Sequence, residues 1–291
     1  MNRKTASSIV TFTRTALFLF ILATLAAQVA TAQQPSAAPA VETKTTDKTA
    51  APSKPDERAE KVLQQAIEAA GGSAFLNVQT VVSRGYFTQF LDGKSGPLTS
   101  FTDYLAFPDR ERTEFKTEGV RSVQTNTGDK GWLFDGMLKK VSDMKPEQVK
   151  DFQVAMRTSI DNILRGWWRK EGAQLSYVGR REGGLAKRND AVRLTYPDGF
   201  IVEFEFGAKD GLPYKTLYKR LNKDGDVVEE EDRHAKHLTV SSVTMPFVID
   251  HFRAGAHTSR INYETVEFNR PLPDALFTRP SDVKSVLKTL K

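Results

Sequence analysis

The feature that most constrains the fold is a long series of short alternating segments separated by turn residues, which begins at Val78 and continues almost to the C-terminus. Asp-Gly and Gly-Pro sequences, such as Asp92-Gly93 and Asp210-Gly211, separate the segments. Such turns at intervals of about 8–12 residues predict one antiparallel sheet. The clearest strand has an apolar face that alternates with a mostly charged one, made by Phe200, Val202, Phe204 and Phe206.

Two amphipathic helices accompany the predicted strands. Asp56 is the predicted N-terminal cap of the first, and Gly71-Gly72 is predicted to end it. The second follows Pro146 as one continuous helix of about 20 residues with a single apolar face. A sheet with one apolar face and a helix of this kind predict an α+β domain in which a curved sheet wraps over the helix. The large residues of the second helix recur at helical spacing at Val149, Phe152, Met156, Ile160, Ile163 and Trp167.

The first 32 residues have the pattern of an export signal. Basic residues precede an apolar run at 16–27, which is long enough for a signal-peptide core but shorter than the ~20 residues of a membrane span. Ala30-Thr31-Ala32 presents small residues where a signal peptidase cleaves, so we expect cleavage after Ala32 and a mature protein without a membrane span. The alternative is an uncleaved anchor.

Composition separates a linker from the folded part. Residues 33–55 are rich in Ala, Pro, Thr, Ser and Lys, which predicts a disordered tether, and 56–291 form the predicted domain. The chain has 42 Lys and Arg against 36 Asp and Glu, a net charge of +6. Three of the basic residues belong to the signal segment, so +3 remains, and a nucleic-acid partner is not predicted. With no Cys, an exported chain depends on its hydrophobic core.

No catalytic or metal-binding pattern stands out. The sequence lacks a nucleophile elbow, a phosphate-binding loop and a dinucleotide fingerprint, so no cofactor, metal or catalytic residue is predicted. His234 and His237 fall on a predicted strand or its exposed end, where residues three apart face opposite sides, and they are interpreted as a solvated loop or strand edge and not as a metal site. The acidic run 229–232 is interpreted as a solvated hairpin arm, and His251 as isolated. Glu203 and Glu205 share a strand face, which leaves a glycoside hydrolase as a third, weaker hypothesis.

The order of the motifs resembles the periplasmic lipoprotein-carrier superfamily, the LolA/LolB-like outer-membrane lipoprotein-sorting proteins. The resemblance covers most of residues 57–283. It implies an unclosed antiparallel β-barrel, or half-barrel, whose interior binds acyl chains of lipoproteins or other lipids without catalysis. Phe107 stands where the sorting carriers have an arginine that holds their helical lid closed. The likeness is carried by residues 85–89, 104–108, Arg112, Glu114, Phe115, 129–134, 245–247, 266–269, 272–277 and Pro280.

Two functions follow from this resemblance. The first is a periplasmic lipid- or lipoprotein-binding protein that carries acylated cargo between envelope membranes, with the second helix as its lid. The alternative is a module of the same fold that recognises an envelope protein or senses stress without bound lipid. An open apolar cavity favours the first function and a filled interior favours the second. The candidate residues for the cavity lining or lid are Trp132, Phe134, Met156, Ile160, Ile163, Trp167, Phe204 and Phe206.

Overall fold

The computed structural model describes residues 56–222 and 224–290. The predicted signal segment 1–32 and tether 33–55 lie outside the described residues, so the division of the chain stays a prediction. Fourteen strands form a single sheet. They are β1 (Thr80–Leu91), β2 (Lys94–Ser95), β3 (Thr99–Ala106), β4 (Arg110–Thr117), β5 (Val120–Thr127), β6 (Lys130–Asp135), β7 (Lys140–Asp143), β8 (Gln174–Glu182), β9 (Arg188–Thr195), β10 (Ile201–Gly207), β11 (Pro213–Leu221), β12 (Val227–Val240), β13 (Val243–Arg253) and β14 (Ala256–Phe268).

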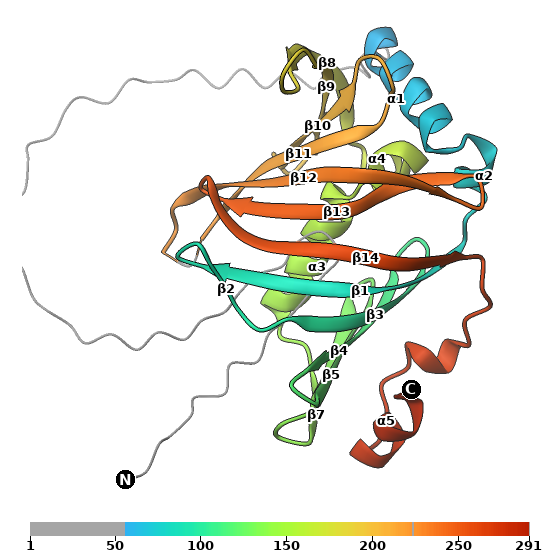
Figure 1. The fold of residues 1–291 in the computed structure, drawn as a ribbon, viewed down its shortest axis with the longest axis vertical. Helices are drawn as coiled ribbons and strands as arrows, with labels where there is room; N and C mark the ends of the chain where they lie inside the picture. Colours follow the sequence, from blue (N-terminus) through green and yellow to red (C-terminus); the bar gives the residue numbers. More distant parts are fainter. Residues whose placement is uncertain (1–55, 223, 291) are drawn as a thin grey trace, which may run out of the picture.

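The sheet is antiparallel throughout and does not close. Its order is β7-β6-β5-β4-β3-β1-β14-β13-β12-β11-β10-β9-β8, with β2 paired to β1 beside this path. The sheet curves around a group of helices and leaves β7 and β8 as free edges (Figure 1). This architecture confirms the predicted α+β fold, an unclosed antiparallel half-barrel wrapped over helices.

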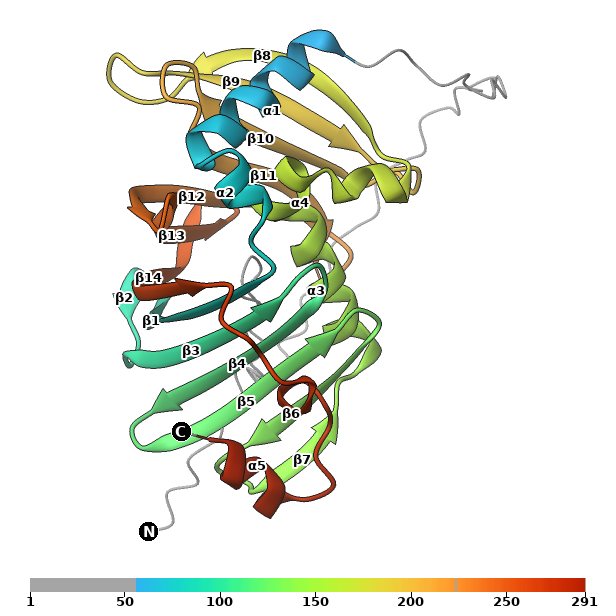
Figure 2. The same cartoon turned by 90° about the vertical axis from the view of Figure 1, so that its right-hand side faces the viewer.

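Helices occupy two places relative to the sheet. Figure 2 shows α1, α2, α3 and α4 against one side of the curved sheet, while the C-terminal segment crosses the strands β3 to β7 on the other side and ends in α5. The helices are α1 (Glu57–Ala70), α2 (Ser73–Leu76), α3 (Pro146–Thr158), α4 (Ile160–Arg165) and α5 (Val283–Thr289), with short 3-10 turns η1 (Trp167–Glu171) and η2 (Asp274–Leu276).

The first helix forms as its sequence predicts. The Asp56 carboxylate accepts hydrogen bonds from the backbone N–H groups of Arg58 and Ala59, which otherwise lack partners at a helix start. Gly71 ends α1 with a left-handed φ of 118°. A Cβ at Gly71 would also overlap the backbone carbonyl of Ser242, so only glycine allows this close approach to the β12–β13 turn.

The second helix is not continuous, contrary to the prediction. Ser159 has extended backbone angles (φ −73°, ψ 147°) and is both the C-cap of α3 and the N-cap of α4. Its hydroxyl accepts a hydrogen bond from Asn162 N at 3.1 Å, so it begins a new helix instead of continuing the old one. The apolar spacing continues across this break, which is why the periodicity alone does not reveal it.

The sheet buries apolar residues on both of its faces. The concave face holds the main core, where Phe101, Phe115, Val192 and Phe204 pack with α1 and α4. A smaller cluster joins Val123, Trp132, Phe134 and Val286. Val123 pairs with Glu114, the neighbour of Phe115, so this cluster lies on the opposite, convex face under α5.

Candidate ligand cavity and buried ionic network

An apolar cavity lies between the helices and the concave face. Its volume is about 90 Å³, the share of about three water molecules in the liquid. Ligand pockets commonly measure about 300–1,000 Å³, so the state described here is nearly closed. Apolar side chains make up most of the lining: Phe75 from α2, Ile160 and Leu164 from α4, Val81 from β1, Val243, Met245 and Ile249 from β13, and Tyr263 and Phe268 from β14.

Arg165 joins the two helices that border this cavity. Its guanidinium donates to the carbonyl oxygens of Phe75, Leu76 and Val78 at 2.9–3.2 Å and pairs with Asp161 at 3.0 Å. The same guanidinium lies 4.5 Å from the centre of the Phe107 ring. Arg165 therefore satisfies carbonyl groups at the end of α2 and ties α4 to them, so the cavity cannot widen at this side without the loss of these bonds.

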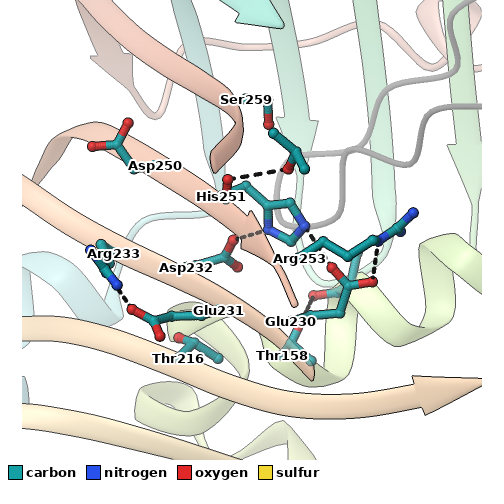
Figure 3. A network of polar contacts seen from close by, with 12 residues as sticks. Thr158, Thr216, Glu230, Glu231, Asp232, Arg233, Asp250, His251, Arg253 and Ser259 are labelled. Carbon is teal, nitrogen blue, oxygen red and sulfur yellow. Dashed lines mark hydrogen bonds and ion pairs between the residues drawn. The ribbon is translucent and has the colours of Figure 1, made fainter. Parts of the chain in front are cut away.

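A network of six charged side chains lies farther along the concave face, and Figure 3 shows four of them, Glu230, Asp232, His251 and Arg253. His251 on β13 bonds through both ring nitrogens, to Asp232 Oδ1 at 2.6 Å and to Glu230 Oε2 at 2.9 Å. Arg253 also donates to Glu230, at 2.9 Å. Glu230 and Asp232 are at most 1% exposed, so both carboxylates depend on these partners for their stabilisation.

The network extends from the sheet to α3. Arg220 on β11 lies 4.0 Å from Glu230 Oε1, and it donates to Asp151 of α3 at 3.0 Å. Three acidic and three basic side chains then face one another, which is the balance a buried charge cluster needs. The interior at Asp151 of α3 is therefore ionic, although the same helix also buries Phe152 and Ala155, whereas the cavity beside α4 is mainly apolar.

Burial and pairing move the pKa values in this network in different directions. Burial raises the pKa of Asp232 and of Asp151, in each case against the effect of a neighbouring cation. The two carboxylates raise the pKa of His251 to about 9 although its burial acts the other way. His251 is therefore protonated at neutral pH and has no nitrogen lone pair for a metal. Within the described ranges, no group of three or more His, Asp or Glu is arranged to hold a metal ion.

Three sequence-based interpretations of this region are wrong. The acidic run is not a solvated arm, since Glu230 and Asp232 point into the interior while Glu229 and Glu231 point away. His251 is not isolated, because strand pairing places Asp232 directly opposite it. His234 is not on a solvated edge: it is 4% exposed, and burial lowers its pKa to about 3. The alternation of the acidic residues was visible, but nothing in the sequence indicated which alternate residues a helix would cover.

Few of the predicted lining residues lie at the main cavity. Ile160 lines it, and Met156 and Trp167 line a smaller adjoining space of about 30 Å³. Ile163 is fully buried in the main core without a place in the cavity wall. Phe204 and Phe206 are also buried core residues, in the part of the sheet where α1 packs on β8 and β9.

Trp132 and Phe134 face the other side of the sheet. They pack with Val286 of the C-terminal helix, and Trp132 Nε1 donates to the carbonyl of Phe277 at 3.2 Å. Trp132 also borders an open groove between α3 and the C-terminal segment.

The cavity-lining residues that the sequence analysis missed come mainly from β13 and β14, such as Met245, Ile249 and Tyr263. The sequence showed that these residues are apolar, but it did not show which end of each strand packs against a helix.

The paired carboxylates of β10 are ion-paired groups on the convex side. Glu203 accepts from Arg181 and Arg193, and Glu205 accepts from Arg181 and Asn189. The two arginines lower the pKa of Glu203 against the effect of burial, which holds it ionised. A glycosidase needs one carboxyl group whose pKa is raised to act as an acid, so this pair does not support the hydrolase hypothesis.

Comparison with solved structures shows the fold. A DUF1329 family protein from Desulfovibrio piger matches at 12% identity, and a LolA superfamily protein from Nitrosomonas europaea at 15%; in each match 76% of this chain and 97% of the other are covered, with a TM-score of 0.52. A putative outer membrane lipoprotein-sorting protein domain from Vibrio parahaemolyticus matches at 12% identity over 80% of this chain and 99% of its own, also at 0.52. The chain therefore has the LolA-like fold.

Comparisons based on the amino-acid sequence identify no related protein. No protein-family model matches it, and a search of curated proteins finds no match. Within the part of the chain that the structure describes, no helix is long and apolar enough to cross a membrane.

Proposed function

We propose that this chain is an exported, periplasmic protein that binds acyl chains of lipids or lipoproteins in the cavity between α2, α4 and strands β1, β13 and β14. The observation that carries the proposal is the apolar lining of this cavity within a LolA-like half-barrel. The protein performs no chemistry on its cargo; it binds by burial of hydrocarbon, which contributes about 0.8 kcal/mol per methylene.

Ligand entry requires the helices to move. A cavity of about 90 Å³ is too small for a long acyl chain, so α4 and the bonds of Arg165 must yield when a chain enters. The break at Ser159 separates α4 from α3, and it supplies a place where the backbone can bend without breaking a helical turn. In the bound state α4 then lies close to the sheet, and release of the ligand to a partner requires α4 to move away from it.

The test is mass spectrometry of organic extracts from the mature protein, purified without detergent from its native envelope, together with uptake of a fluorescent acyl probe. A stoichiometric lipid or acylated peptide supports the proposal. Met245→Trp, which fills the cavity, is expected to reduce probe affinity at least about tenfold, equal to ~1.4 kcal/mol. The matched control is Leu185→Trp at a position that is 99% exposed, and equal uptake by the two variants would contradict the proposed site.

A second candidate function is recognition of an envelope protein. The observation in its favour is that side chains and the ionic network fill most of the interior, which leaves little free space for a ligand. An extract without lipid, combined with no uptake of the acyl probe, would replace the first function with this one.

A further inference from the structure

The apolar cavity and the ionic network are consecutive along the same strands. His234 of β12 and Ile249 of β13 are register partners and both line the cavity. Two residues farther along each strand, the partners are Asp232 and His251, and the next pair on that face is Glu230 and Arg253. Two residues along a strand span about 7 Å. The cavity therefore meets buried charge within one step of the side-chain alternation.

The helices that face these strands show the same sequence of an apolar part followed by a charged part. Ile160, Leu164 and Arg165 of α4 border the cavity, whereas Asp151 of α3 bonds to Arg220 in the network. Toward β4, the smaller adjoining space ends at Arg110 and Glu111. Along β12 and β13, and toward β4, an alkyl chain that extends beneath α3 thus meets charged side chains.

From this arrangement we propose that the network of the buried Asp232, His251 and Glu230 with the half-buried Arg253 is a wall that ends the acyl site and limits the length of alkyl chain the protein accepts. The inference rests on the proposed function and specifies its ligand: a single aliphatic chain of limited length. Every charged group in the network already has a partner of opposite charge without a ligand, although Asp232 Oδ2 is buried without a hydrogen-bond partner.

The energetic reason is that burial of one more methylene gains less free energy than separation of a buried ion pair costs. Each additional methylene moved out of water improves binding about fourfold. Separation of a buried, hydrogen-bonded ion pair costs several times as much, because each charge loses a partner in a place that water does not reach. A growing chain therefore gains affinity until its end meets Asp232 and His251, and it gains nothing by a further methylene.

The experiment measures affinity for saturated fatty acids from octanoate to octadecanoate by displacement of a fluorescent acyl probe. In the wild-type protein we expect affinity to rise about fourfold per methylene and then to stop rising at a chain shorter than octadecanoate. The double variant Asp232→Ala/His251→Ala removes one negative and one positive charge and creates space, so the longest chain that still improves affinity is expected to lengthen by at least two carbons.

The matched control removes a pair on the opposite face of β13. Arg260 donates to Asp250 at 2.6 Å across β13 and β14, and Asp250→Ala/Arg260→Ala is expected to leave the length limit unchanged. If the interior double variant does not fold, Ile249→Phe tests the same geometry, because a larger side chain at the end of the cavity should shorten the limit.

The outcomes separate the wall from the proposed function. Wild-type affinity that keeps rising through octadecanoate overturns the wall and leaves acyl binding intact. A limit that stays the same in the folded interior variant, or in Ile249→Phe, overturns it as well. A wild-type protein that binds no fatty acid and no probe overturns both proposals.

Discussion

At the scale of single residues, two buried histidines on neighbouring strands have opposite protonation behaviour. His251 lies between two carboxylates that raise its pKa to about 9, while His234 lies beside Thr216 and has its pKa lowered to about 3 by burial. The pKa of a histidine in an unfolded chain is about 6.5. Folding therefore favours the proton on His251 and opposes it on His234, although the side chains share one face of the sheet.

The residue-scale prediction is a stability maximum near pH 6.5. Stabilisation from His251 is fully present below about 6.5 and is lost as pH rises through about 9, because the unfolded state releases its proton first. His234 has the reverse effect, so stability falls as pH drops from about 6.5 toward 3. Chemical denaturation at a series of pH values measures both limbs.

Substitution of His251 tests whether this residue causes the loss of stability between pH 6.5 and 9. His251→Gln is expected to cost about 3–5 kcal/mol, since it leaves buried carboxylates without their cation, and to flatten the decline between pH 6.5 and 9. His257→Gln is the control, because His257 pairs with Asp250 on the other face of β13. An unchanged alkaline limb in His251→Gln would show that another group causes it.

At the scale of elements, Asp56 connects the first helix to the free edge of the sheet. Its carboxylate accepts from two N–H groups at the start of α1 and also from the backbone N–H of Tyr177 on β8, at 2.7 Å. These backbone bonds, led by that of Tyr177, lower the pKa of Asp56. One side chain thus caps a helix and satisfies a donor on β8, which is an edge strand of the sheet formed by the described residues.

The element-scale prediction is that Asp56→Ala costs more than a simple cap. Loss of an N-cap costs typically about 1 kcal/mol and up to about 2, and we expect the upper value here with faster hydrogen exchange in β8. Asp282→Ala is the comparison, because Asp282 caps the start of α5 by accepting a hydrogen bond from Ser285 N at 2.8 Å. Equal losses in the two variants, with β8 exchange unchanged, would contradict the double role.

At the scale of the whole molecule, the C-terminal segment closes the convex face over the second apolar cluster. Arg112, which is 1% exposed, donates to the carbonyl of Leu276 at 3.1 Å and to the hydroxyl of Thr289 at 2.9 Å, and it pairs with Glu114. Because these contacts span more than 160 positions of the chain, one buried cation on β4 holds both ends of the segment that covers Trp132.

The prediction at this scale is release of the segment when Arg112 is lost. Arg112→Leu is expected to destabilise the protein by about 3–5 kcal/mol and to shift Trp132 fluorescence to longer wavelength. Loss of the folded conformation of the segment is also expected to let trypsin cleave after Lys284 and Lys288, which the ordered α5 protects. Arg110→Ala removes the more exposed pair with Asp274 and is expected to cost at most about 1 kcal/mol. Protection from trypsin that persists in Arg112→Leu would assign the closure to apolar packing alone.

What the sequence by itself determined is local. The cap at Asp56, the stop at Gly71, the alternation along 200–206 and the hairpin turns each depend on residues a few positions apart, whose backbone bonds and side-chain periodicity do not require the rest of the chain. These motifs predicted a curved sheet over a helix, and the half-barrel was implied by the resemblance to the lipoprotein-carrier superfamily. Their spacing could not reveal the break at Ser159, because a bend need not interrupt an apolar stripe.

Only the tertiary structure decided which residues form the cavity and which charges are buried. Asp232 and His251 are 19 positions apart and meet through strand register, and Trp132 lies beneath a segment that follows it by 145 positions. Whether a carboxylate is solvated, or an aromatic ring faces a cavity, depends on what covers that face of the sheet. The curvature of the sheet and the placement of α3, α4 and α5 set this, and both are products of packing between distant segments.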